Sequence, residues 1–439
     1  MGPLKLFKAF CLLLLIFSFA CGDKESSKII FSARLNQADY PWLKGKKVFV
    51  DAGHGGTAAT DKFRNGPFGV TEEAVNLRVA LFLEAMLKQT EVEVFMSRRS
   101  DIDVPLDERC RMVQNAQPDI LVSIHHNGTI HAADGVNYTC VLIRGSHESH
   151  PASADLAVLL KDELAKVIDA PALVISDYSV FQENGTRILR ETESVCPGVI
   201  GEGGFFSDPA QALLMKDTDY NKREAEAYFK AISNYFKKGL PAGQIYFSCP
   251  VWNGTIRVKS PSVFLKVDSG IEGVNVKEDS IFISLDDLPL GVTKWRENIF
   301  RVNYGNVIHP GGHRLRFRFR NTSGQSSMIM YSSFISDVEA GDYANLIKNG
   351  RKLFNRGDVK EGLKMLISAN SMEPTGPNSA GLIKDIADGF AKLGVKDMAE
   401  YYSLALRHFH PDGAPAGNSV WHPAKYHGKN IPIIFGTMP

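Results

Sequence analysis

The sequence predicts an α/β domain with a mostly parallel, twisted sheet and helices on both faces. A small antiparallel β-sandwich and a short all-α segment of helical repeats are expected to follow it. Three observations lead to this prediction. Strand and helix patterns alternate over residues 46–240, short β runs separated by turn residues fill 244–336, and a helical pattern repeats within 340–411. Alternating strands and helices favour a parallel sheet, whereas short strands at turn spacing favour a sandwich.

Apolar periodicity defines the elements of the first domain. The run Ile120–Ile124 is typical of a buried strand, and Val75, Val79 and Phe82 recur at helical spacing. The predicted strands are 47–50, 93–96, 120–124, 136–142 and 198–200. The predicted helices are 75–86, 106–115, 154–168, one near 210, and 223–236.

The β segment is predicted from four short runs, 256–258, 263–265, 281–283 and 315–319. Turn pairs such as Ser269-Gly270 and Gly311-Gly312 separate them. In Leu315–Phe319 apolar residues alternate with arginine, so we expect one face of this strand to be buried and the other wet.

The helical segment repeats an order of small residue, packed residue and proline. Gly357, Ala369 and Pro374 recur 37 residues later as Gly394, Leu406 and Pro411. This order resembles two tetratricopeptide-like units. Two helical pairs are few for a free solenoid, so we expect them to pack on a neighbouring domain.

The N-terminus has the pattern of a targeting segment. Lys5 and Lys8 precede the apolar run Ala9–Ala20, which indicates a secretory signal over 1–20. The stretch Ser18–Gly22 resembles a bacterial lipoprotein lipobox, although Ser18 stands where Leu is most common. The resemblance implies lipidation of Cys21 and a tether over 21–45. The protein would then be a lipoprotein of the cell envelope, facing the periplasm or held in the outer membrane. An ordinary signal cut elsewhere is the alternative.

Composition excludes other classes. The 439 residues are 44% hydrophobic and 23% charged, as in globular proteins. Lys and Arg total 50 against 49 Asp and Glu, so no whole-chain charge would attract nucleic acid, and no nucleic-acid partner is expected. The spacing of Cys110, Cys140, Cys196 and Cys249 predicts no particular disulfide and no zinc-ligand pair.

Residues that could carry chemistry follow three predicted strands. His54 lies in the glycine-rich stretch after 47–50, His125 follows 120–124, and Glu202 follows 198–200. Ligands of open α/β sheets bind beyond the carboxyl ends of strands, so these side chains could converge. Taken singly, each is more typical of an ordinary loop residue.

A fourth candidate begins the helix after Thr71. On one interpretation Thr71 caps this helix, while Glu72 and Glu73 favour the helix dipole as surface charges. On the other, one of the two acids joins the residues at the strand ends.

Together these residues resemble the zinc-dependent N-acetylmuramoyl-L-alanine amidases of the amidase-3 type. The resemblance covers about residues 46–236, and it departs from the family pattern at His126, where a small residue is usual, and at Asp208, where Asn is usual. The matching blocks are Asp51–Gly56; Glu72 with Asn76-Leu77; Ser97-Arg98 with Asp101, Leu106 and Arg109; Ser123–Asn127; and Glu202–Asp208.

The resemblance implies one Zn²⁺ per chain, held by His54, Glu72 and His125. Glu72 is chosen over Glu73 because the family's Glu precedes its Asn by four residues. The first histidine of the strand-end pair is the family's ligand, so His126 is not chosen. Glu202 corresponds to the catalytic carboxylate.

The chemistry of these residue types agrees with the resemblance. Zinc binds histidine nitrogen and carboxylate oxygen, and three protein ligands leave a position for water, as in catalytic sites. Zinc lowers the pKa of bound water to about 7, and Glu202 would carry its proton to the leaving amine. The resemblance alone implies the bond, the amide between N-acetylmuramic acid and L-alanine of the peptidoglycan stem peptide.

Two alternatives remain open, a zinc peptidase acting on stem peptides and a tethered cell-wall-binding protein with an inactive amidase domain. The C-terminal segments could bind a protein or a glycan. Other candidate residues compete less well. His147 and His150 lie in a polar loop and are more typical of solvated histidines, whereas His309 and His313 lie in the β segment with no carboxylate pattern near them. Arg187 and Arg190 could hold substrate carboxylates, but surface charge is an equally good interpretation. The expected division is a signal peptide 1–20, a tether 21–45, an amidase domain 46–240, a β-sandwich 244–336, helical repeats 340–411 and an irregular tail 412–439.

Overall fold

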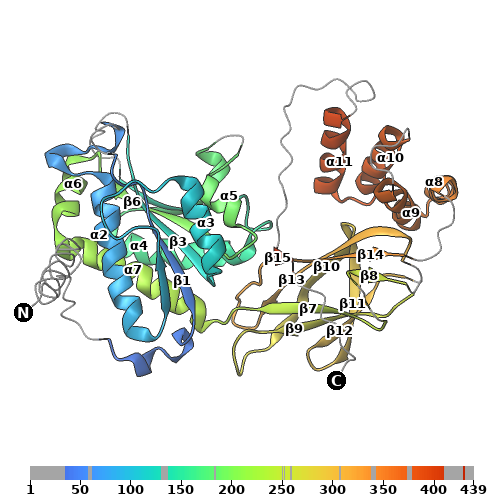
Figure 1. Ribbon diagram of the computed structural model, residues 1–439, viewed down its shortest axis with the longest axis horizontal. Coiled ribbons are helices and arrows are strands. Elements are labelled where there is room, and N and C mark those ends of the chain that lie inside the picture. The colour runs from blue at the N-terminus through green and yellow to red at the C-terminus, as the bar shows by residue number, and fades with distance from the viewer. Residues whose placement is uncertain are drawn as a thin grey trace, which may run out of the picture.

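The structure, a computed structural model, describes residues 35–57, 62–129, 137–181, 184–249, 251, 253–257, 260–305, 308–337, 343–372, 378–409 and 429–430. The predicted signal peptide and Cys21 lie outside these residues. An α/β domain, a β domain and a helical segment follow one another along the chain (Figure 1). No helix among the described residues combines the length and the apolar character needed to cross a membrane.

A six-stranded sheet forms the centre of the α/β domain. Its strands are β1 (Lys47–Ala52), β2 (Glu93–Met96), β3 (Ile120–Asn127), β4 (Thr139–Ile143), β5 (Ala172–Ser176) and β6 (Gly198–Phe205). They lie in the order β2-β1-β3-β6-β4-β5. The first four strands of this order are parallel, whereas β4 runs antiparallel to β6 and pairs in parallel with β5. The carboxyl ends of β1, β3 and β6 therefore meet at one edge.

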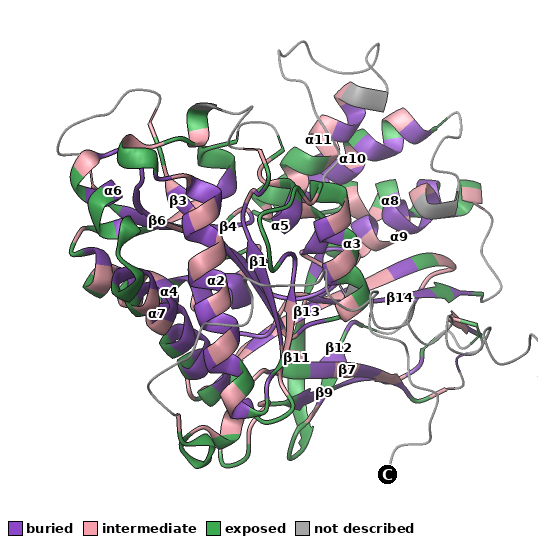
Figure 2. Cartoon of the chain, turned by 60° about the vertical axis from the view of Figure 1, so that its left-hand side comes forward, coloured by how far each residue is buried: buried purple, intermediate pink, exposed green. Residues whose placement is uncertain are grey.

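Helices cover both faces of this sheet, as predicted. On one face α2 (Glu72–Leu87), α4 (Pro151–Ile168) and α7 (Thr218–Lys237) pack on Val50, Val122 and Val199. On the other, α3 (Leu106–Ala116) and α5 (Arg187–Thr192) pack on Leu121 and Ile200. The helix α6 (Pro209–Lys216) lies beside α7, and burial is concentrated in the strands and the inner helix faces (Figure 2). Short 3₁₀ turns are η1 (Gln37–Asp39), η2 (Pro41–Leu43), η3 (Lys62–Arg64), η4 (Pro67–Gly69), η5 (Lys88–Thr90) and η6 (Asp177–Ser179).

The β domain is a mainly antiparallel sheet that folds back on itself. Its hydrogen-bonded order is β15-β14-β13-β10-β11-β12-β9-β7, with β8 paired to β14. The ring of Phe247 on β7 lies 4.9 Å from that of Phe334 on β14, so the two ends of this order face each other across one core. The strands are β7 (Ala242–Phe247), β8 (Thr255–Ile256), β9 (Val263–Asp268), β10 (Val276–Leu285), β11 (Leu288–Arg296), β12 (Ile299–Asn303), β13 (Gly311–Asn321), β14 (Met330–Ser336) and β15 (Lys429–Asn430).

Two helical pairs complete the fold. They are α8 (Tyr343–Asn355) with α9 (Val359–Met372), and α10 (Ser379–Lys392) with α11 (Lys396–Phe409). Gly357 and Gly394 join the helices of each pair with φ of 93° and 74°, a backbone conformation that favours glycine. The pairs pack on the β domain, as expected: Leu288 joins their core, and Lys364 donates to the carbonyl of Tyr304 at 2.7 Å. Their tetratricopeptide-like character stays a prediction.

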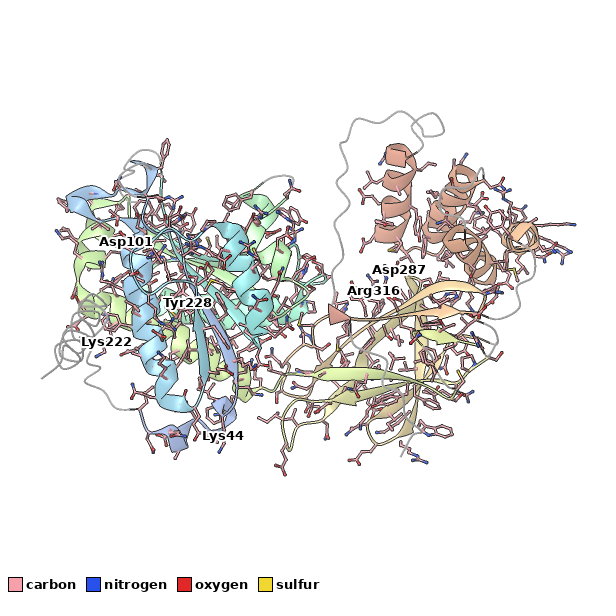
Figure 3. The ribbon with its side chains drawn as sticks, in the orientation of Figure 1. Lys44, Asp101, Lys222, Tyr228, Asp287 and Arg316 are labelled. Atoms are coloured by element: carbon pink, nitrogen blue, oxygen red, sulfur yellow. The ribbon has the colours of Figure 1, made fainter. Side chains whose placement is uncertain are left out.

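The arginine face of β13 is less open than expected. Arg314, Arg316 and Arg318 are half-buried and line a pocket of about 450 Å³ beneath α11. The Nε of Arg316 lies 3.8 Å from Asp287, where the β domain meets the helical segment (Figure 3). The alternation along the strand thus correctly marks one core face, but neighbouring segments partly cover the other.

Candidate active site

The loop after β1 holds His54 in an unusual backbone conformation. His54 has a φ of 58°, in the left-handed region that non-glycine residues seldom adopt. Two buried arginines fix this loop through its carbonyl oxygens. Arg98 donates to Ala52 at 2.9 Å and to Gly53 at 2.8 Å, while Arg109 donates to Ala52 at 2.7 Å and to His54. Such strain persists where surrounding contacts over-determine the conformation.

Gly53 lets two candidate residues approach each other. A Cβ at this position would lie 2.4 Å from the ring of His125, so any side chain would displace that imidazole. The ring centroids of His54 and His125 are 4.6 Å apart, and the two ring planes are nearly perpendicular. Gly53 is therefore required by the close approach of the His125 ring, whereas Gly55 and Gly56 make room for the backbone of Ile102 and Asp103.

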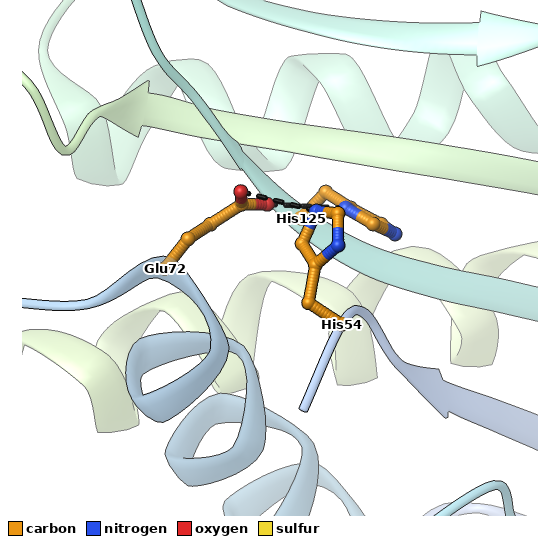
Figure 4. Close-up of side chains that lie close together, drawn as sticks. All are labelled: His54, Glu72 and His125. Atoms are coloured by element: carbon orange, nitrogen blue, oxygen red, sulfur yellow. Dashed lines mark hydrogen bonds and ion pairs between the residues drawn. The ribbon is translucent and has the colours of Figure 1, made fainter. Parts of the chain in front are cut away.

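The Glu72 carboxylate faces both histidines (Figure 4). Its Oε2 is 3.1 Å from His54 Nε2, and its Oε1 is 3.1 Å from His125 Nδ1. Burial alone would raise the pKa of this carboxyl, but the hydrogen bonds from His125 and His54 hold it well below its ordinary value. Thr71 occupies the N-cap position without a side-chain cap hydrogen bond, and Glu73 turns away to accept from the backbone N–H of Thr57 at 3.2 Å.

Glu202 stands beside the three residues on the neighbouring strand. The β3–β6 register pairs it directly with His125, and its side chain lines the same cleft as His54 and Glu72. Among the described residues, its carboxylate has no hydrogen-bond partner. Burial raises its pKa to about 7, although the charge of His125 partly offsets this effect.

His126 faces the other side of β3, where it is buried between α2 and α7. Its Nδ1 lies 2.7 Å from Asn76 Oδ1, and its Nε2 lies 3.0 Å from Glu224 Oε2. Burial lowers the pKa of His126, but the Glu224 carboxylate more than compensates and the net pKa is raised. The His126 side chain therefore lies outside the group formed by His54, Glu72 and His125.

A cleft of about 700 Å³ opens over this group. Its walls include Tyr138, Phe181 and Phe205, and Arg187 of α5 pairs with Asp107 of α3 at its rim. Exposed apolar residues such as Phe181 at a concave site are typical of ligand-binding surfaces. Arg190 instead donates to the carbonyl of Asn184 and pairs with Glu191.

The remaining histidines lie elsewhere. His147 contacts Arg320 of the β domain at 3.0 Å, and His150 pairs with Glu193 at 3.2 Å. The sequence interpretation that no carboxylate lies near His313 is wrong: strand pairing brings Asp286 within 2.7 Å of its Nδ1, and its Nε2 lies 2.6 Å from the carbonyl oxygen of His309. Cys110, Cys140 and Cys249 are free thiols.

The group formed by His54, Glu72 and His125 fits a zinc ion. Each residue offers one ligand atom, and the three atoms lie within 4.8 Å of one another. His54 and His125 each lie 3.1 Å from a different oxygen of Glu72, close to the spacing of about 3.3 Å between two ligand atoms of a tetrahedral ion with bonds of about 2.0–2.1 Å. Two nitrogens and one carboxylate are also a donor set that catalytic zinc uses.

Sequence reasoning missed Glu224. It lies 98 residues from His126, and only the return of α7 across the sheet brings the two together. One signal was present, because Glu224 falls on the apolar stripe of that helix with Ala227, Tyr228 and Ala231. A charged residue on a core-facing stripe indicates a buried partner.

Known proteins match the α/β domain. Residues 48–234 match the sequence model of a family described as N-acetylmuramoyl-L-alanine amidase. The germination-specific N-acetylmuramoyl-L-alanine amidase of Bacillus subtilis (strain 168) is 24% identical over 252 residues, covering 53% of this chain and 94% of the relative. The N-acetylmuramoyl-L-alanine amidase CwlM of Bacillus licheniformis is 27% identical over 207 residues, covering 46% and 72%. A solved N-acetylmuramoyl-L-alanine amidase from Clostridium difficile 630 is 26% identical, covers 44% of this chain and 97% of that chain, and has a TM-score of 0.38.

Proposed function

Since residues 48–234 form a domain of the N-acetylmuramoyl-L-alanine amidase family, we propose that it uses one zinc ion held by His54, Glu72 and His125, with Glu202 as the general base. The protein hydrolyses the amide bond between N-acetylmuramic acid and the L-alanine of the stem peptide. The observation that carries the zinc proposal is the Glu72 carboxylate, which meets one imidazole with each of its oxygens.

When bound, zinc would supply Lewis-acid polarisation of the scissile carbonyl and a lowered pKa for water. Glu202 would accept the proton of the attacking water and deliver it to the leaving amine. Its free carboxylate oxygens suit this role, because no neighbouring described residue occupies them. A cation beside Glu202 would lower its pKa from about 7 and favour the ionised base.

The cleft has apolar walls and an arginine at its rim, and these features suit an extended substrate. Apolar walls at Tyr138, Phe181 and Phe205 could contact a sugar ring or a peptide methyl group, and Arg187 offers a cation to the carboxylates of a stem peptide. Because Arg187 is already paired with Asp107, a substrate carboxylate would compete with that partner.

Digestion of purified sacculi tests the function. We expect the full chain to release intact stem peptides from glycan strands, and a zinc chelator to stop the release until zinc is restored. Mass analysis of the fragments separates the alternatives: shortened stem peptides would indicate a peptidase, and the absence of any product would indicate an inactive binding protein.

Action on the cell wall places this domain outside the cytoplasm. We further propose that Cys21 carries lipid and that residues 21–45 tether the enzyme to a membrane of the envelope, with the periplasm as its working compartment. Mass analysis of the mature N-terminus tests this proposal. The wild-type protein should carry acyl chains at Cys21, and Cys21→Ser should remove them without changing hydrolysis by the detergent-purified enzyme.

A further inference from the structure

We infer that His126 and Glu224 are positioning residues, which act through Asn76 to hold the Glu72 carboxylate in place for the metal. This inference rests on the proposed zinc site. Neither residue touches the reacting atoms.

The two residues form a fully buried pair behind the strand end. The side chains of His126 and Glu224 are both inaccessible to solvent, with Nε2 and Oε2 3.0 Å apart. Gly203 on β6 makes room for them, because a Cβ there would lie 2.6 Å from the His126 ring and 3.0 Å from Glu224. The backbone is thus shaped to admit a large polar side chain at this position.

Asn76 connects the pair to Glu72. Its Nδ2 donates to the carbonyl of Gly53 at 3.1 Å and to Glu72 Oε1 at 3.3 Å. Both partners are acceptors, so the amide nitrogen must face them, and Oδ1 must face His126 Nδ1 at 2.7 Å. A donor at His126 Nδ1 is compatible with only this one of the two flips, so His126 reinforces the orientation of the Asn76 amide.

These contacts fix one oxygen of the Glu72 carboxylate. Glu72 Oε1 accepts hydrogen bonds from Asn76 Nδ2 and from the backbone N–H of His126, each at 3.3 Å. Its other oxygen faces His54. Contacts of this kind behind the ligands fix their orientation and are typically worth a factor of about 10–100 in metal affinity.

Stability alone gives a poor account of the pair. Glu224 Oε1 is buried without a hydrogen-bond partner among the described residues. Burying an ion pair with an unsatisfied oxygen usually stabilises a fold no more than apolar residues of similar volume would. A role toward the ligand Glu72 explains why the charges lie there.

Zinc affinity of the full chain tests the inference. The double variant His126→Ala/Glu224→Ala removes both charges and leaves no orphan ion. We expect its zinc dissociation constant, measured by competition with a chromophoric chelator, to rise about 10–100-fold. The absorption bands of the cobalt-substituted protein should also shift, because they report ligand geometry. Tyr235→Phe is the matched control, since it removes a buried hydrogen bond from α7 to Ala152 and should alter neither readout.

A conservative variant separates positioning from packing. The amide nitrogen of asparagine can occupy the place of histidine Nδ1, so His126→Asn/Glu224→Ala restores a donor to Asn76 and should recover most of the lost affinity. Zinc affinity and cobalt bands equal to wild type in the alanine double variant would overturn the inference. If the wild-type chain itself bound no zinc, the proposed function would fail instead.

Discussion

Two carboxylates at the same sheet edge have opposite electrostatic environments. Burial disfavours the charge of both Glu72 and Glu202. Around Glu72, two imidazoles overcome that effect and hold its pKa well below the ordinary value. Glu202 has no such partners, and its pKa rises to about 7. Identical side chains that line one cleft thus suit the two different tasks proposed for them, a charged ligand and a proton carrier.

The low pKa of Glu72 depends on its two histidine partners, so the removal of one histidine should have the largest effect on the site. We expect His54→Ala to lose bound zinc and to reduce hydrolysis of sacculi to background, because the remaining pair offers too few ligands. Elemental analysis and product release measure both effects. His147→Ala, at an exposed histidine outside the cleft, is the control and should retain zinc and activity. Parental activity in His54→Ala would contradict the ligand assignment.

Replacement of Glu202 should leave zinc bound but reduce hydrolysis, unlike replacement of His54. Glu202→Gln should keep zinc at the wild-type ratio and lower kcat by a factor of about 10²–10⁴, the usual contribution of a general acid–base group. Zinc analysis and initial rates on the same preparation separate binding from chemistry. Unchanged kcat in a zinc-loaded Glu202→Gln enzyme would show that another group carries the proton.

Arg109 helps to hold the loop that places His54 beside Glu72. This guanidinium is buried and pairs with Asp51 at 2.6 Å while holding the loop carbonyls. Arg109→Met should lower the free energy of unfolding by about 3–5 kcal/mol, because Asp51 remains buried without its partner. Arg111→Met on the same helix removes only an exposed pair with Glu108, and it should change stability by less than about 1 kcal/mol in denaturant titration. Equal effects would contradict the structural role of Arg109.

The smallest expected effect is a pH dependence of the metal-free protein. The pKa of Glu202 is raised from 4.5 to about 7 on folding, so the native state binds its proton more tightly than the unfolded state. The resulting stabilisation is fully present below about pH 4.5 and is lost as the pH rises through about 7. Relative to Glu202→Gln, wild type should lose about 1–3 kcal/mol over this range, since partial exposure reduces the full linkage value. A wild-type stability that stays constant or increases relative to Glu202→Gln as the pH rises would contradict the environment assigned to Glu202.

The sequence predicted the parts of this fold that have strong local patterns. The convergence of His54, His125 and Glu202 was predictable because parallel strands share one carboxyl edge, although β3 and β6 continue beyond His125 and Glu202. Glu72 could be chosen over Glu73 only through its family spacing, since both begin the same helix and both are buried.

The elements that escaped prediction have weak patterns for physical reasons. β5 lies at the sheet edge with its residues only partly buried, so no apolar alternation marks it. α5 has six residues, fewer than two helical turns, which is too short to show periodicity. The contacts of His126 with Asn76 and Glu224 depend on how two helices pack over one strand, and spacing along the chain carries no trace of them.

Anomalous scattering from a crystal of the full chain at the zinc absorption edge would locate the metal itself. We expect one strong peak per chain, within about 2.0–2.2 Å of ligand atoms from His54, Glu72 and His125 and beside the Glu202 carboxylate. A peak held by other side chains, or no peak in crystals grown with zinc, would contradict the proposed zinc site.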